Sequence, residues 1–127
     1  MRRKLEKGTL IYVAGPYSPL KDCSLHNASR TAQQNVDRAI DVGIRLLKLG
    51  YIPLIPHLSH YIHLRMDQDL GDAWYKIDYK YLDVCPAIVL LNGWQQSFGA
   101  CNERKRAFLQ NKIILTESDI EVMEKSR

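Results

Sequence analysis

Hydrophobic positions follow two different spacings along the chain. Short, nearly continuous apolar runs alternate with longer segments in which apolar residues recur every three or four positions, and these patterns are typical of buried strands and amphipathic helices. Predicted strands occupy residues 9–14, 51–56, 86–91 and 112–116. Predicted helices occupy residues 28–49, 72–84 and 98–109, and a last short helix follows the fourth strand.

The order of these elements predicts the fold class. Strands that are apolar throughout and alternate with helices are typical of a parallel sheet with helices on both faces. The long helix before Gly50, a residue that commonly ends helices, supplies the crossover that parallel neighbours need. We predict a single α/β domain with a flavodoxin-like or Rossmann-like doubly wound sheet of four to five strands. It would span residues 9–127, after a basic N-terminal tail at residues 1–8.

The amino-acid composition mainly excludes certain classes of protein. Hydrophobic residues make up 46% and charged residues 25% of the chain, as in ordinary globular proteins, so a disordered chain is not expected. The longest apolar runs fall far short of the ~20 residues that a membrane-spanning helix needs. No apolar signal-peptide core follows the basic tail. We therefore expect a cytoplasmic protein without a membrane span.

The cysteines and the net charge also exclude some kinds of site and partner. The three cysteines are widely spaced: Cys23, Cys85 and Cys101. An odd number at such spacing fits reduced thiols better than a disulfide framework, and there is no paired-cysteine zinc motif. The net charge is +4, but basic residues are scattered apart from the tail and residues 104–106. A small anionic ligand fits this pattern better than nucleic acid, which is an unlikely partner.

A ligand site is expected at one edge of the predicted sheet. Ligands of doubly wound sheets bind beyond the carboxyl ends of the strands, where the strand order reverses. Three predicted loops lie there: residues 15–27, the segment from residue 57, and residues 92–98. Tyr12 and Tyr17 border the first loop. A strand tyrosine is usually part of the core, but one at a strand mouth can donate a hydrogen bond to a carboxylate.

The third loop predicts an anion site. It runs from a buried strand directly into a helix, so free backbone N–H groups and the positive helix end face the crevice. Ser97 can cap this helix and donate its hydroxyl to a phosphate, while Gly99 allows the backbone to approach a ligand closely. An ordinary N-cap is an equally good interpretation of these residues.

Two carboxylates are candidates for chemistry. Glu103 lies one turn inside the same helix, near its mouth, although a Glu before the basic residues 104–106 is more often a solvated surface charge. Asp78 lies within an apolar helical face, where desolvation would raise its pKa and suit it to donate a proton. The alternative is an ion pair between Asp78 and a basic residue such as Arg104. Arg104 itself falls on the predicted buried stripe, which indicates either an acid across a subunit interface or a wrong helix phase.

His57, His60 and His63 recur at intervals of three. Metal binding is the weaker interpretation, because the shape of the segment is unknown and no HExxH motif is present. Histidines that contact a ligand base or cap a loop are commoner. We expect no metal ion and no redox cofactor.

Taken together, several motifs resemble the nucleoside 2-deoxyribosyltransferase superfamily. The motifs are residues 11–18, Pro56-His57, residues 74–78, Gly93-Trp94 and Ser97-x-Gly99-Ala100-x-x-Glu103. The resemblance covers about residues 9–115 and is closest to the small bacterial and phage branch, near the deoxynucleoside 5'-phosphate N-hydrolases. Each motif alone is weak, and their combination is fairly specific.

The resemblance implies roles for individual residues. Glu103 would be the nucleophile that attacks the sugar C1', Asp78 would protonate the departing base, and Tyr12 would hold the nucleophile. Ser97, six residues before Glu103, would bind a 5'-phosphate. Further substrate contacts would come from Gly15, Tyr17, Ser18, His57, Trp94 and Gly99.

The resemblance also implies an activity. The chain would cleave or transfer the N-glycosidic bond of a nucleoside or its 5'-monophosphate by double displacement, with water or a second base taking the sugar from Glu103. A homodimer or larger homo-oligomer with shared active sites is expected. The alternatives are a catalytically inactive nucleotide-binding or sensing module and, least favoured, a basic nucleic-acid accessory protein.

Overall fold

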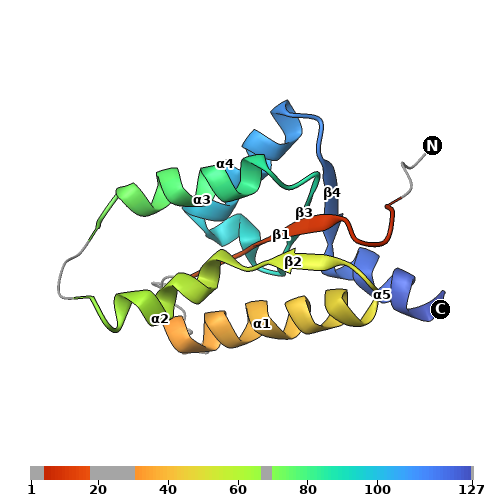
Figure 1. The fold of residues 1–127 in the computed structure, drawn as a ribbon, viewed down its shortest axis with the longest axis horizontal. Coiled ribbons are helices and arrows are strands. Elements are labelled where there is room, and N and C mark those ends of the chain that lie inside the picture. The colour runs from red at the N-terminus through yellow and green to blue at the C-terminus, as the bar shows by residue number, and fades with distance from the viewer. Residues whose placement is uncertain (1–4, 18–30, 67–69, 127) are drawn as a thin grey trace.

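The computed structural model describes residues 5–17, 31–66 and 70–126. Its sheet has four strands, namely β1 (Leu10–Ala14), β2 (Ile52–Leu54), β3 (Ala87–Leu90) and β4 (Ile113–Thr116). The strand order is β2-β1-β3-β4, and every neighbouring pair is parallel. Figure 1 shows this sheet between two layers of helices, which confirms the predicted doubly wound class.

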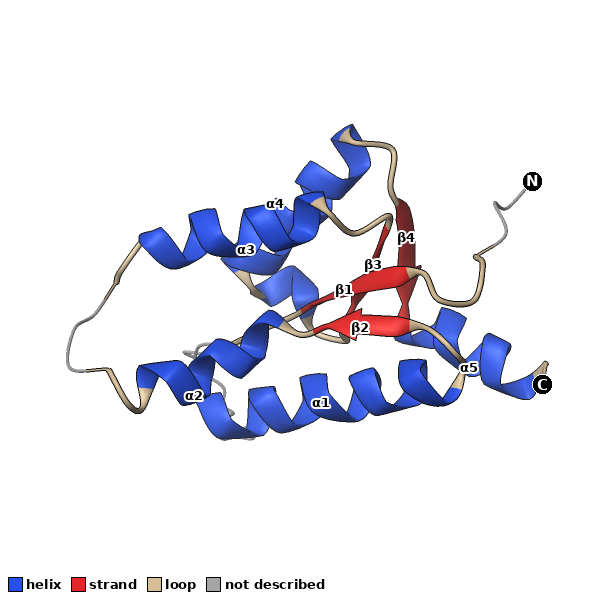
Figure 2. Cartoon of the chain, in the orientation of Figure 1, coloured by secondary structure: helices blue, strands red, loops and turns tan. Residues whose placement is uncertain are grey.

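Within these residues, five α-helices and two 3-10 helices flank the sheet. Figure 2 shows the helices in blue and the strands in red. The α-helices are α1 (Ala32–Lys48), α2 (Ser59–His63), α3 (Ala73–Asp83), α4 (Phe98–Leu109) and α5 (Glu117–Lys125). The 3-10 helices are η1 (Pro56–Leu58) and η2 (Trp94–Gln96). Residues of α1 and α5 pack on one face of the sheet, and residues of α3 and α4 pack on the other.

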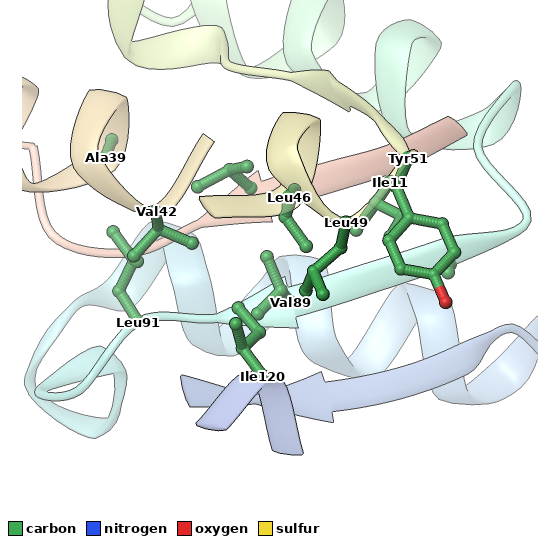
Figure 3. Close-up of a cluster of buried hydrophobic side chains, with 11 residues drawn as sticks. Ile11, Ala39, Val42, Leu46, Leu49, Tyr51, Val89, Leu91 and Ile120 are labelled. Carbon is green, nitrogen blue, oxygen red and sulfur yellow. The ribbon is translucent and has the colours of Figure 1, made fainter. Parts of the chain in front are cut away.

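Alternation along the central strands builds two separate cores. Ile11 and Val13 of β1 face α1 and α5, in the cluster drawn in Figure 3. Tyr12 and Ala14 face the opposite way, toward α3 and α4. Because both faces of β1 and β3 are buried, these strands are apolar throughout, and this continuity explains why the sequence predicts them well.

The long helix α1 has a clear beginning and end. Thr31 is its N-cap and forms a capping box with Gln34, so the helix begins at Ala32 and not at residue 28 as predicted. Gly50 follows the last turn with a φ of +93°, a backbone conformation that favours glycine, and this confirms it as the stop.

The segment after β2 differs from the sequence prediction, which placed a loop there. Pro56 begins η1, and α2 continues directly from it. Proline presets the helical φ and lacks only an N–H that a first turn leaves unpaired, so this helical start has a local cause. None of the described helices is long and apolar enough to cross a membrane.

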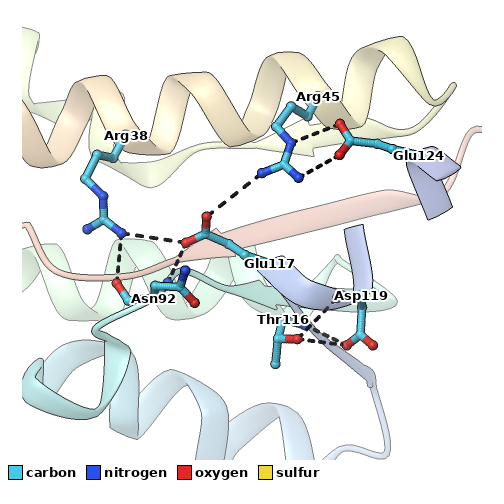
Figure 4. Close-up of polar contacts among 7 residues, drawn as sticks. All are labelled: Arg38, Arg45, Asn92, Thr116, Glu117, Asp119 and Glu124. Carbon is cyan, nitrogen blue, oxygen red and sulfur yellow. Dashed lines mark hydrogen bonds and ion pairs between the residues drawn. The ribbon is translucent and has the colours of Figure 1, made fainter. Parts of the chain in front are cut away.

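Polar contacts connect α1 and α5 to the loop after β3 (Figure 4). Arg45 binds Glu124 through two hydrogen bonds of 3.0 and 2.7 Å. Arg38 donates to the carbonyl of Asn92 at 2.9 Å, and the Asn92 N–H donates to Glu117 at 2.6 Å. Residues far apart in the sequence therefore fix where the chain leaves β3.

Two substitutions on α5, one at a buried and one at an exposed position, test how this helix packs on the sheet. Ile120 is fully buried against the α1 side of the sheet, so Ile120→Ala should lower the free energy of unfolding by about 2–4 kcal/mol. Val122 is 58% exposed, so Val122→Ala should change it by less than about 0.5 kcal/mol. Chemical denaturation measures both values, and equal losses would contradict this packing.

Candidate active site

A cavity of about 610 Å³ lies beyond the carboxyl ends of the strands, a volume typical of small-molecule sites. The chain leaves β1 toward β2 on one side and later enters β3 on the other, so the cavity occupies the switch point of the sheet. Seven of the predicted site residues line it: Gly15, Tyr17, His57, Asp78, Ser97, Gly99 and Glu103. Tyr12 contacts it through Glu103, Trp94 does not line it, and Ser18 lies outside the described residues.

Glu103 is buried although it precedes three basic residues. Ala100 and Ala107 lie on the same face of α4, and the three side chains pack toward the sheet. The carboxylate oxygen Oε2 accepts a hydrogen bond from the hydroxyl of Tyr12, at the centre of β1. No partner for the other oxygen, Oε1, lies within the described residues, and this leaves it for a ligand.

Burial dominates the electrostatics of this pair. Desolvation raises the pKa of Glu103 to about 8, an effect that the Tyr12 hydrogen bond opposes and the negative charge of Asp78 reinforces. Burial, followed by the charge of Glu103, raises the pKa of the Tyr12 phenol far above its ordinary value. Tyr12 therefore stays a neutral hydrogen-bond donor.

Asp78 enters the cavity from α3. Desolvation raises the pKa of its carboxyl group to about 6, as the apolar surroundings in the sequence indicate. Its Oδ1 atom is shielded from solvent and has no partner within the described residues, and the same holds for Nε1 of Trp74, one turn earlier on α3. Among the described residues, one oxygen of this carboxyl group and the indole N–H, both on residues that line the cavity, thus have no hydrogen-bond partner.

The loop after β1 passes close to β3 and is tied to η1. A Cβ atom at Gly15 would lie 2.6 Å from Cδ1 of Leu91, so only glycine fits there without displacing the leucine. Nε2 of His57 lies 3.1 Å from the carbonyl oxygen of Pro16 and donates to it. Burial lowers the pKa of His57, more strongly than its backbone hydrogen bonds raise it.

The three regularly spaced histidines surround Tyr17. His60 Nδ1 lies 2.9 Å from the Tyr17 hydroxyl, the His63 ring stacks on the Tyr17 ring at 6.3 Å, and His57 meets it edge-on. His63 also contacts Trp74, at 4.8 Å between ring centroids. Within residues 5–17, 31–66 and 70–126, no group of three His, Cys, Asp or Glu side chains is arranged to hold a metal ion.

Ser97 caps α4 at the cavity. Its hydroxyl oxygen accepts the N–H of Ala100 at 3.1 Å, and its carbonyl accepts that of Cys101. The N–H groups of Phe98 and Gly99 are then the ones left for an anion to bind. The Ser97 hydroxyl keeps its own proton to donate.

Arg104 does not lie on the buried face of α4, so the second explanation that the sequence offered, a wrong helix phase, is confirmed. Its side chain is exposed and its guanidinium lies 5.3 Å from the centre of the Trp94 ring, so it does not pair with Asp78. The basic partner on this helix is Arg106, which binds Asp83 through two hydrogen bonds of 2.8 Å. The helix phase was misread because α4 directs large apolar side chains outward and small ones inward.

Among the wall residues that sequence reasoning did not assign to the site are His63 and Trp74. It weighed His63 as a metal ligand, a base contact or a loop cap, and it placed Trp74 only in the motif at residues 74–78. Pro56 could have indicated that His63 lies on the cavity wall. A helical segment that begins at a proline brings residues at intervals of three, such as the histidines, onto one face. For Trp74, the signal was its position one turn before Asp78. An indole at that spacing shares the helix face of the carboxylate.

The family assignment comes from the length of chain that a family model covers. A model described as a domain of unknown function, DUF1937, matches residues 9–118. The chain belongs to the DUF1937 family. No curated protein matches it. The matched region contains the four strands and every cavity residue of the DUF1937 domain.

The buried carboxylate of this DUF1937 domain should lower its stability at high pH. The folded-state pKa of Glu103, about 8, lies above the ordinary 4.5, so the native state binds more protons than the unfolded chain between these values. The free energy of unfolding therefore falls as the pH rises through this window. Glu103→Gln should be more stable than wild type by up to roughly 5 kcal/mol above pH 8, and equally stable near pH 4.5.

Thermal and chemical unfolding across this pH range measure the effect. Glu121→Gln, an exposed position on α5, is the matched control and should follow the wild type at every pH. A constant offset between Glu103→Gln and wild type would contradict a raised pKa at Glu103.

Proposed function

We propose that this DUF1937 domain cleaves the N-glycosidic bond of a nucleoside or nucleoside 5'-monophosphate through a glycosyl intermediate on Glu103. One observation carries the proposal: the cavity brings together a buried carboxylate that a strand tyrosine holds and a second, partly desolvated carboxyl group. Paired carboxylates in different environments are typical of glycosyl transfer. The motifs that resemble the nucleoside 2-deoxyribosyltransferase superfamily support the same chemistry.

In the first step, Glu103 and Asp78 act on opposite ends of the scissile bond. Oε1 of Glu103 forms a bond to C1' of the sugar as the bond from C1' to the base nitrogen breaks. The protonated carboxyl group of Asp78 gives its proton to the departing base. The Tyr12 hydroxyl donates a hydrogen bond to Oε2 and fixes the carboxylate, so that Oε1 stays directed at C1' of the sugar.

In the second step, water or another base releases the sugar. The acceptor attacks C1', its proton passes to the carboxylate of Asp78, and the bond between C1' and Glu103 breaks. Water yields a free sugar, and a second base yields a new nucleoside. Both carboxyl groups return to their starting state.

The reaction needs one proton on the carboxylate pair, and that proton must be on Asp78. Of the two carboxyl groups Glu103 has the higher pKa, about 8 against about 6, so before the reaction the proton resides mainly on Glu103. Positive charge that develops on the sugar favours the ionised form of Glu103 beside it. As the bond to the base breaks, this interaction therefore favours the reactive arrangement, with Glu103 ionised and the proton on Asp78.

The N-terminus of α4 suits a phosphate. The unpaired N–H groups of its first turn, together with the Ser97 hydroxyl, provide several donors for one anion at the cavity wall. The spacing of Ser97 from Glu103 resembles that of the 5'-monophosphate N-hydrolases. We therefore favour nucleotides over nucleosides as substrates.

A homo-oligomer is part of the proposal. Phe98, Phe108 and Leu109 of α4 are 75%, 65% and 71% exposed, which is unusual for three large apolar side chains on one helix. Phe98 also lines the cavity, so a second copy on this helix would help to close the site. The free cysteines Cys85 and Cys101 fit a cytoplasmic location.

Base release is the direct test. Nucleosides and their 5'-monophosphates are incubated with the protein, with and without a second base, and free base is measured by chromatography. Wild type should release base, and Glu103→Gln should lose at least about 1000-fold of the rate. Asp78→Asn should lose about 100- to 10,000-fold with natural substrates.

A substrate with a p-nitrophenol leaving group separates the two roles. That group departs without a proton, so Asp78→Asn should recover on it while Glu103→Gln should not. Nucleotide binding without turnover of any substrate would leave the inactive binding module as the function.

The pH dependence of base release should be bell-shaped. The pair holds the one required proton between apparent pKa values near 6 and 8, so the rate should be greatest between them and fall on both sides. Initial rates in buffers of constant ionic strength measure the profile. A rate that is level from below the lower value to above the upper one would exclude this pair as the acid and the nucleophile.

A further inference from the structure

One ring nitrogen of His57 is hydrogen-bonded to the backbone, and the other has no hydrogen-bond partner within the described residues. The ring is almost fully buried, with 5% of its surface exposed, and lines the cavity. Nε2 faces the carbonyl oxygen of Pro16 at 3.1 Å, and the backbone of Gly15 also interacts with the ring. A carbonyl can only accept, so Nε2 carries the proton. Nδ1 is shielded from solvent and has no partner within the described residues.

The chemical character of Nδ1 follows from this geometry. Burial lowers the pKa of His57, so the ring is neutral. A neutral imidazole with its proton on Nε2 presents a lone pair at Nδ1 and can only accept a hydrogen bond there. A buried acceptor without a donor is unfavourable, so a ligand that fills the cavity gains by supplying a donor.

The position of His57 indicates which part of a nucleotide supplies it. Ring contacts run from His57 to Tyr17, then to His63 and Trp74, so His57 is linked to the α3 wall through two other rings. In the proposed reaction, Asp78 of that wall takes the base. Phosphate oxygens at neutral pH accept and do not donate, which leaves the hydroxyl groups of the sugar.

We propose that Nδ1 of His57 accepts a hydrogen bond from a hydroxyl group of the substrate's sugar, and that the site rejects nucleotides lacking this hydroxyl. The inference rests on the proposed function for the class of ligand, and it adds a requirement on the sugar that glycosyl chemistry alone does not impose. A site built around an unpaired acceptor discriminates strongly, because without the hydroxyl the buried nitrogen stays unpaired.

Two substitutions separate the nitrogens of the ring. In His57→Gln the side-chain amide nitrogen can replace Nε2 against Pro16, while the acceptor at the Nδ1 position is lost. In His57→Asn the amide oxygen can replace Nδ1, while the contact with Pro16 is lost. Thermal unfolding of both variants checks that the cavity remains folded.

The experiment measures binding by calorimetry in a Glu103→Gln background, where turnover does not interfere. The ligands are adenosine 5'-monophosphate and its forms without the 2'-hydroxyl, without the 3'-hydroxyl, or without both. Loss of one hydroxyl should weaken binding about 10- to 100-fold when His57 is present. With His57→Gln the same loss should matter less than about 3-fold, and His57→Asn should retain part of the discrimination.

The outcomes distinguish this inference from the proposed function. Equal binding of all four nucleotides, or equal discrimination with and without His57, overturns the sugar contact even if wild type releases base. Discrimination that depends on His57, with no base release by wild type, supports the contact and overturns the glycosidase. Absence of binding by all four nucleotides overturns the sugar contact.

Discussion

The hydrogen bond between Tyr12 and Glu103 ties the centre of the sheet to the helix that bears the candidate nucleophile. A carboxylate packed against a strand needs a donor, and a tyrosine on the central strand supplies one from within the core. Ala100 and Ala107 on either side of Glu103 are small, so α4 approaches the sheet closely enough for the contact. The position of α4, and with it the mouth of the anion site, depends on this pair.

This arrangement is costly for the folded state and useful for chemistry. Desolvation raises the pKa of both Glu103 and Asp78, so each ionised form is less favourable than in water. A core designed for stability alone would place apolar groups there. Perturbed carboxyl groups share this cavity with an indole N–H and an imidazole nitrogen that have no partner in the part of the chain that the structure describes. Such a combination is instead typical of a binding site, where a ligand completes the missing interactions.

The fold was predictable because β1 and β3 are buried on both faces and leave continuous apolar runs in the sequence. Asp78 was recognisable because its helical neighbours are apolar. The orientation of Glu103 was not predictable from periodicity, since the inner face of α4 consists of two alanines and a glutamate while phenylalanines point outward. The ring cluster around Tyr17 was missed because residues 57–63 were assigned to a loop, and Ser18 lies outside the described residues.

Separate sets of contacts hold the two loops that flank the cavity. His57 binds the carbonyl of Pro16 and draws the loop after β1 toward η1. Arg38 and Glu117 bind the backbone of Asn92 and hold the loop after β3 to α1 and α5, on the face of the sheet opposite α3 and α4. Helices α1 and α5, which lie on the face of the sheet opposite α3 and α4, therefore influence the candidate active site. They do so because Glu117, at the start of α5, binds the loop that leads into α4. Changes in α5 would reach the anion site through Asn92, without contact with any ligand.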